Sequence, residues 1–211
     1  MTAPISESWT RIENWLAEHA PATYAALGPP ADPAVIAALE RVIGRPLLKP
    51  LTMSLLRHDG LLDWRFSLLP GSYTLLSARE ISTEWHSLGE YFDRSTADER
   101  GEEDVDYDFM RIGSSGILYG HPQLIPIARD TCGGRLVLDH RPEIDRGRIH
   151  KTDAVEGVSR QSHEMWTSLP VLMEVIARSL ETNQPLNDYM PVVDEEQRLH
   201  WDYIPLRSDR T

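Results

Sequence analysis

Apolar residues recur at three- and four-residue intervals in several stretches of the chain, a spacing typical of amphipathic helices that pack one face on a core. The apolar residues of each stretch fall on one side of a helix, and polar residues fill the other side. This pattern predicts helices within residues 6–21, 28–46, 50–58, 77–92 and 168–183.

Helix-boundary residues support three of these predictions. Asp32 is placed to cap the second helix, Pro33 suits its first position, and Gly44 suits its C-terminal stop. Ser77 and Glu80 have the spacing of a capping box. Ser168 is placed to cap the last helix.

A second kind of pattern, short apolar runs separated by Gly, Pro and Asp, predicts strands of an antiparallel meander. The runs occupy residues 116–120, 124–130, 134–140, 147–151 and 154–159, and residues 64–71 are predicted as a separate short strand before the helix at 77–92. In the tail, Leu199, Trp201 and Tyr203 alternate with polar residues, which predicts an extended segment against the body. The pattern thus predicts helices at the start, an antiparallel meander and a closing helix.

The length of 211 residues is consistent with a single domain over 1–211, with an acidic loop inserted at about 93–108 and a tail at about 183–211. A net charge of −12 disfavours binding to nucleic acid or to an anionic membrane and favours a basic protein partner. The single cysteine excludes an intramolecular disulfide, and the N-terminus lacks a signal-peptide pattern. We therefore expect a cytoplasmic protein, whose oligomeric state the sequence leaves open.

The stretch IARDTCGGRLVLDHRP, residues 127–142, has the composition of a catalytic loop but is better explained as a hairpin. Cys132 matches no nucleophile signature. Gly133 and Gly134 could supply the positive backbone angles of a tight turn. Asp139 lies at the end of the second strand, where it can accept backbone N–H bonds from the turn after it, near Arg141.

A metal-assisted hydrolase is the enzymatic alternative, and it would use His58, Asp59, Asp139 and His140, with His121 or His150 nearby. No metal-binding spacing, nucleophile elbow or phosphate-binding loop supports it. We therefore predict no catalytic residues, no metal and no cofactor.

Two features are candidates for recognition of a partner. One is exposed tryptophan, for which Trp64 and Trp201 are the candidates, although core packing is the simpler explanation for each. The other is an acidic run that could attract a basic surface, although a solvated loop is the simpler explanation by a narrow margin. The run contains Glu102, Glu103, Asp104, Asp106 and Asp108.

The order of these segments resembles the SUKH superfamily, which includes yeast cell-wall synthesis regulators and many bacterial homologues. Coverage runs from about residue 9 to residue 201. The resemblance is carried by WTRIENWLAEHAP, LGPPADPAVIAALERVIGRPL, LLRHDG with Gly60 at its end, IPIARDTCGGRLVLDHRP, and YMPVVDEEQRLHW.

The resemblance implies an α+β fold, with helices packed around a mostly antiparallel sheet of about six strands, and no established catalytic residues. Bacterial members neutralise toxins, often nucleases, by direct binding, and yeast members are regulatory scaffolds. It therefore implies a protein-binding module, either an immunity protein against a basic toxin or nuclease domain or a regulatory scaffold. The chain departs from the family where Arg135 follows Gly133 and Gly134, because the acidic residue often found after the glycine is missing.

Overall fold

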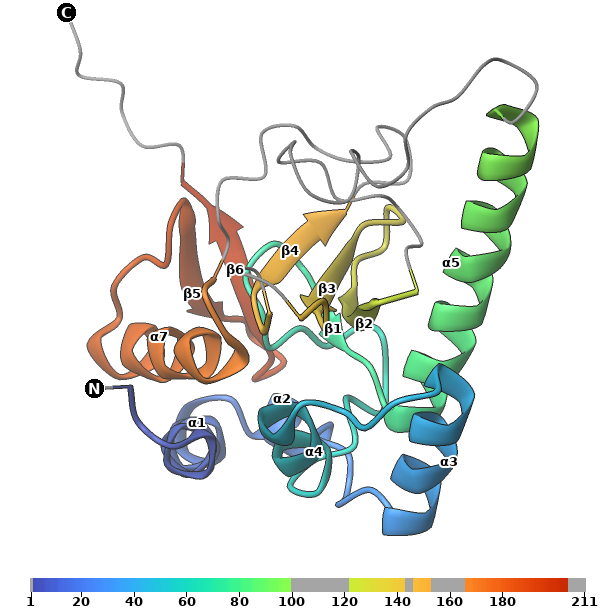
Figure 1. Cartoon of the computed structure of the whole chain (residues 1–211). Helices are drawn as coiled ribbons and strands as arrows, with labels where there is room; N and C mark the ends of the chain where they lie inside the picture. Colours follow the sequence, from blue (N-terminus) through green and yellow to red (C-terminus); the bar gives the residue numbers. More distant parts are fainter. Residues whose placement is uncertain (1, 100–121, 143–145, 153–165, 205–211) are drawn as a thin grey trace, which may run out of the picture.

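A computed structural model describes residues 2–99, 122–142, 146–152 and 166–204 of the chain (Figure 1). These residues form six helices and six strands, so the predicted α+β class is confirmed. The helices are α1 (Ile5–His19), α2 (Pro21–Ala25), α3 (Pro33–Ile43), α4 (Lys49–Leu55), α5 (Ala78–Glu99) and α7 (Leu169–Thr182). The strands are β1 (Thr74–Leu75), β2 (Leu124–Arg129), β3 (Arg135–Asp139), β4 (Ile149–Thr152), β5 (Tyr189–Val193) and β6 (Leu199–Tyr203).

The predicted helix boundaries agree with the structure where capping residues define them. The Asp32 carboxylate accepts a hydrogen bond from the Ala34 N–H at 2.8 Å, and Gly44 ends α3 with a φ of 75°. The Ser168 hydroxyl accepts from the Val171 N–H at 3.3 Å at the start of α7. These contacts satisfy backbone groups that a helix end leaves unpaired.

Two predictions about local structure were wrong. The helix that starts near residue 78 continues to Glu99, so residues 93–99 are helical and not part of a loop. Ala, Arg and Glu in that stretch have good helix propensity, which favours continuation of the helix.

The predicted strand over residues 64–71 is also absent, and the strand in this region is the two-residue β1. The Asp63 carboxylate accepts a hydrogen bond from the Arg65 N–H at 2.9 Å, and the Phe66 N–H donates to the Asp63 carbonyl at 3.1 Å. An aspartate that bonds its own backbone two residues on makes a turn, which competes with an extended strand.

The strands of the described residues are divided between two antiparallel sheets, one ordered β1-β2-β3-β4 and the other a β5-β6 hairpin. The predicted hairpin over residues 127–142 is confirmed, because β2 pairs with β3. The predicted extended tail is the hairpin partner β6, in which Leu199 and Trp201 are buried but Tyr203 is exposed.

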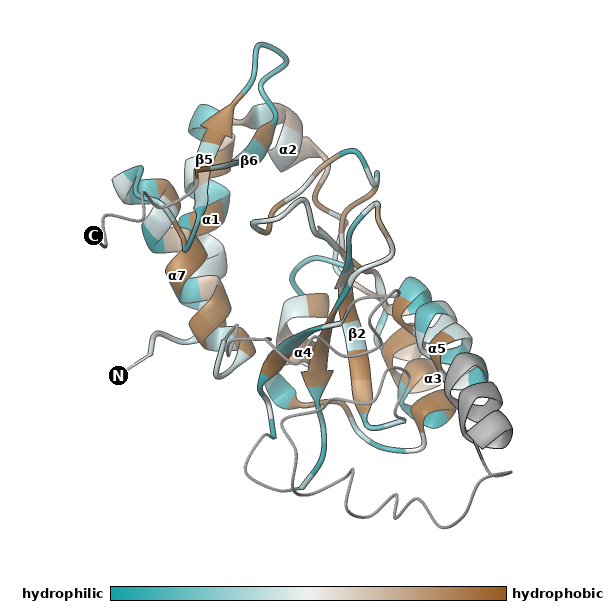
Figure 2. Ribbon diagram, turned by 90° about the horizontal axis from the view of Figure 1, so that it is seen from above, coloured by the Kyte–Doolittle hydropathy of each residue, from teal (hydrophilic) through white to brown (hydrophobic). Residues whose placement is uncertain are grey.

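The main core lies between the four-stranded sheet and the helices. Leu136 and Leu138 of β3 belong to it, while Val137 packs with Leu124 on the other face. In Figure 1, α5 and the β5-β6 hairpin lie at opposite ends of the molecule. Figure 2 shows β2 hydrophobic along most of its length, and five of its six residues are buried.

The first and last helices pack on each other, and the tail is bonded to the N-terminal helices. The Leu199 N–H donates to the Thr23 hydroxyl at 2.8 Å, and the Trp201 indole N–H donates to the Leu68 carbonyl at 3.3 Å. Within the part of the chain that the structure describes, no helix has the length and apolar content to cross a membrane.

Candidate functional site

The loop between α4 and β1 carries two of the most exposed large apolar side chains among the described residues. Leu62 is 67% exposed and Trp64 is 63% exposed. Large apolar side chains on a surface are candidates for contact with a partner when they lie together next to a concavity.

The other tryptophan proposed as an anchor is in a different environment. Trp201 is 6% exposed, and its indole N–H is bonded to a backbone carbonyl. The simpler explanation, core packing, therefore describes Trp201, and its ring is not on the surface that a partner would meet.

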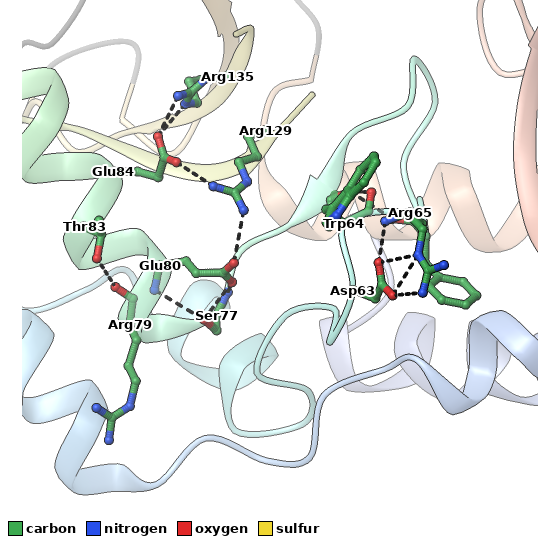
Figure 3. Close-up of polar contacts among 12 residues, drawn as sticks. Asp63, Trp64, Arg65, Ser77, Arg79, Glu80, Thr83, Glu84, Arg129 and Arg135 are labelled. Carbon is green, nitrogen blue, oxygen red and sulfur yellow. Dashed lines mark hydrogen bonds and ion pairs between the residues drawn. The ribbon is translucent and has the colours of Figure 1, made fainter. Parts of the chain in front are cut away.

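A pocket of about 500 Å³ opens beside Trp64, within the size range of ligand pockets in proteins. Figure 3 shows Trp64, Asp63 and Arg65 on one side of it, and Glu80 and Arg129 on the other. The lining residues are Leu61, Leu62, Asp63, Trp64, Arg65, Thr74, Glu80 and Arg129.

The wall formed by α5 and the sheet is held by a network of ion pairs. The Arg129 guanidinium donates to Glu84 Oε1 at 2.9 Å and reaches Glu80 Oε1 at 3.4 Å, and Arg135 Nε donates to Glu84 Oε2 at 2.7 Å. The Ser77 hydroxyl donates to Glu80 Oε2 at 2.8 Å, and the Glu80 N–H donates to the Ser77 hydroxyl at 3.3 Å, which confirms the predicted capping box. The Glu80 carboxylate is thus fixed by the helix end and by Arg129 (Figure 3).

The opposite wall contains a second ion pair. Arg65 Nε lies 3.0 Å from Asp63 Oδ2. The same carboxylate accepts the Arg65 backbone N–H in the turn that replaces the predicted strand. Hydrogen bonds from the Arg65 side chain, and then from its backbone N–H, lower the pKa of Asp63 to about 2, so this carboxylate is ionised at neutral pH. Two carboxylates and two guanidiniums therefore line the pocket.

The position of the Trp64 loop depends on a junction formed by His58, Asp59 and Gly60. The Asp59 carboxylate accepts from the Ala78 N–H at 2.6 Å, at the first residue of α5. The Gly28 N–H donates to the Gly60 carbonyl at 2.9 Å, and the Leu61 N–H donates to the Leu75 carbonyl at 3.1 Å. These bonds connect α5, β1 and the N-terminal helices immediately before the pocket loop begins.

Gly60 itself is required by this geometry. Its φ is +73°, and a Cβ atom there would lie 2.5 Å from the Ser77 backbone nitrogen. Sequence reasoning placed Gly60 at a helix end, but α4 ends at Leu55, so the glycine serves the junction and not a cap.

The four residues of the hydrolase hypothesis are divided between two places. His58 Nε2 lies 2.8 Å from Glu13 Oε1, its Nδ1 lies 2.8 Å from the Gly28 carbonyl oxygen, and Asp59 is bonded to α5. Asp139 and His140 lie at the end of β3. Among the described residues, no group of three or more His, Cys, Asp and Glu side chains is arranged to hold a metal ion, and His121 lies outside those residues.

The surroundings of Asp139 favour its charged form, whereas those of His140 favour its neutral form. Burial would raise the pKa of Asp139, but the neighbouring His150 and Arg141 hold it below its ordinary value. Asp139 Oδ1 accepts from the Arg141 N–H at 2.8 Å, as expected for the strand-end aspartate. Burial, and then the charges of Arg45 and Arg146, lower the pKa of His140 to about 4, so this imidazole is neutral at pH 7.

The turn between β2 and β3 needs both glycines, but for different reasons. Gly133 has a φ of 97°, as predicted for a tight turn. Gly134 does not have a positive φ, so that part of the prediction was wrong. A Cβ atom on Gly134 would lie 2.5 Å from Asp130 Oδ2, and the Asp130 carboxylate accepts from the Gly134 N–H at 2.7 Å. The carboxylate that closes the turn therefore occupies the space a side chain would need.

The acidic run from Glu102 to Asp108 lies outside the described residues. It follows the C-terminal end of α5 in the sequence, and Glu80 in the first turn of that helix lines the pocket.

Comparison with known proteins identifies relatives of the chain. The model of the SMI1 / KNR4 family (SUKH-1) matches residues 30–182. The cell wall biosynthesis/cell cycle regulator smi1 of Schizosaccharomyces pombe is 29% identical over 147 residues. That alignment covers 66% of this chain and 29% of the yeast protein, so the chain matches less than a third of its relative's length.

Proposed function

The chain belongs to the SMI1/KNR4 (SUKH-1) family, and from this premise we propose that it is a non-catalytic protein-binding module of the immunity type, which neutralises a cognate toxin by direct binding. The partner would contact the pocket beside Trp64. The resemblance of the sequence to the SUKH superfamily is the source of the immunity assignment, and the arrangement around Trp64 is the observation that supports a binding surface.

The exposure of Trp64 and Leu62 supports this choice of surface. Tryptophan is enriched among the few interface residues that dominate binding energy, and such residues pack in pockets from which water is excluded. Here the indole already borders a pocket, and its loop is bonded to α5 and β1 through the junction. A loop whose backbone is held this way loses little additional backbone freedom when a partner covers it.

The charge of the chain supports the kind of partner. A net charge of −12 would accelerate encounter with a basic protein such as a nuclease domain and would oppose direct binding of nucleic acid. Three of the four side chains considered for catalysis have structural partners, which supports a non-catalytic role: His58 with Glu13, Asp59 with the start of α5, and Asp139 with Arg141. The fourth, His140, is buried, and its Nε2 has no hydrogen-bond partner among the described residues.

A regulatory scaffold of the same fold is the alternative, and the Schizosaccharomyces pombe relative favours it because that protein is a cell wall and cell cycle regulator. The two functions differ in a simple observation. An immunity protein rescues growth of cells that express its partner, whereas a regulatory scaffold leaves their growth unchanged.

Replacing Trp64 with alanine is expected to weaken binding of the cognate partner by about 30-fold or more, because truncation of a central aromatic residue commonly costs 2 kcal/mol or more. The partner would be captured on the immobilised chain from native lysate, identified, and then measured with purified proteins by calorimetry. Tyr203→Ala is the matched control, because Tyr203 is 62% exposed, lies on β6 and is not among the residues that line the pocket. Equal affinity of the Trp64 variant and the wild type would contradict the proposed surface.

A further inference from the structure

We infer that the pocket beside Trp64 receives one uncharged aromatic side chain of the protein partner, an inference that rests on the proposed function. The overall charge of the chain favours a basic partner, which would make an arginine or lysine the obvious occupant. The local arrangement of charges in the pocket indicates otherwise.

The charged side chains of the pocket already satisfy one another. Asp63 is paired with Arg65 across the turn, and Glu80 is paired with Arg129 and bonded to Ser77. The four charges cancel, in contrast to the net −12 of the chain. A cationic occupant would approach two guanidiniums and an anionic one two carboxylates, so either would lose its hydration without an unpaired charge to replace it.

The uncharged part of the lining favours an aromatic ring. Leu61 is buried at the pocket, and Leu62 and Trp64 lie exposed on either side of Asp63 in the chain. A ring that packs on the Trp64 indole gains about 0.5–1.5 kcal/mol beyond the area it buries, an advantage that an aliphatic side chain lacks. Covering these apolar side chains removes their surface from water, which is the main source of affinity in the centre of an interface.

The acidic run that could attract a basic partner follows α5 in the sequence and lies outside the described residues. Glu80 is in the first turn of α5, and the helix ends at Glu99, about 28 Å further along its axis at 1.5 Å per residue. Long-range attraction by the net charge of the chain would act on the rate of encounter, whereas contacts in the pocket would determine how long the complex lasts.

Three small probes test the chemistry of the occupant without knowledge of the partner. N-acetyl-L-phenylalaninamide, N-acetyl-L-argininamide and N-acetyl-L-glutamic acid α-amide, which keeps its side-chain carboxylate, would be titrated at millimolar concentration into the ¹⁵N-labelled full chain. The indole N–H signals report on the site, and Trp64→Phe assigns the Trp64 signal among those of the six tryptophans. The aromatic probe is expected to shift the Trp64 signal saturably and to bind at least about fivefold more tightly than either charged probe, a difference of about 1 kcal/mol.

Leu62→Ala is expected to lower the affinity for the aromatic probe, and Tyr203→Ala is the control that should leave this affinity unchanged. Stronger binding of the arginine or glutamate probe, or no saturable shift of the Trp64 signal with the aromatic probe, would overturn the inference. The proposed function fails by a different result, namely an unchanged affinity of Trp64→Ala for the captured partner. The two proposals can also part: if Trp64→Ala abolishes partner binding but the wild-type chain does not bind the aromatic probe, the proposed function stands and the aromatic occupant is refuted.

Discussion

Replacing Gly60 with alanine is expected to lower the free energy of unfolding by at least about 3 kcal/mol, because two separate costs act at this position. The first is a φ of +73°, a conformation that an L-residue with a side chain adopts at a cost. The second is steric, since the new Cβ atom would lie 2.5 Å from the Ser77 nitrogen and 2.6 Å from the Leu76 carbonyl carbon. Both are backbone atoms, so no side-chain rotation relieves the contact. Urea denaturation followed by circular dichroism measures the loss.

Gly44 provides the matched control for this prediction. Its φ is +75°, nearly the same, but nothing lies within 4 Å of the position a Cβ atom would take. Gly44→Ala should therefore show only the conformational cost, on the order of 1 kcal/mol. Similar losses in the two variants would show that the junction tolerates the extra methyl group, and the account of how the Trp64 loop is positioned would be wrong.

Replacing Asp139 with asparagine is expected to destabilise the fold by about 3 kcal/mol, as is usual when one partner of a buried ion pair is removed. The Asp139 carboxylate is completely buried, and it accepts bonds from the Arg141 side chain and backbone N–H. Asparagine keeps one acceptor for the backbone but removes the carboxylate charge that pairs with the Arg141 guanidinium. Thermal and urea unfolding at pH 7 would measure the effect.

Asp63→Asn is the matched control, because the Asp63–Arg65 pair has the same spacing and the same bonds but lies at the surface. Its stability should stay close to that of the wild type, since exposed ion pairs contribute little. If both substitutions are equally mild, burial of the Asp139 pair does not stabilise the end of β3.

The Asp139 prediction also has a pH dependence of definite sign. The pKa of Asp139 is lower in the folded chain than the ordinary value of about 3.9 expected on unfolding. The stabilising contribution of this carboxylate is therefore complete above about pH 4 and decreases as the pH falls through the folded pKa. The difference in stability between wild type and Asp139→Asn should shrink in that acidic range, and a difference that grows there would contradict the assigned ionisation.

The features that the sequence predicted correctly are contacts between residues close together in the chain. Asp32 and Ser168 at helix starts, Gly44 at a helix end, and the Ser77–Glu80 box all make the expected contacts. The Asp139 contact with the backbone of Arg141 was also predictable, because it needs only a strand end and a turn. Each of these features involves residues at most four positions apart.

The features that the sequence did not reveal depend on residues far apart in the chain. Asp59 accepts a hydrogen bond from the start of α5, nineteen residues later, a contact that its neighbours in the sequence do not predict. Next to His58 in the sequence, it suggested a metal ligand instead. Trp64 and Trp201 were equivalent candidates until packing placed one on the surface and the other in the core. The pocket also needs Arg129 from β2 beside residues 61–65, a proximity that only the fold creates.

The central claim, that the chain recognises another protein through the pocket beside Trp64, is tested most directly by hydrogen–deuterium exchange of the chain alone and in complex with its captured partner. We expect slower exchange in peptides that cover residues 61–65 and the first turns of α5, and unchanged exchange in the β5-β6 hairpin. Protection confined to the hairpin or to α7, with none around Trp64, would contradict the claim.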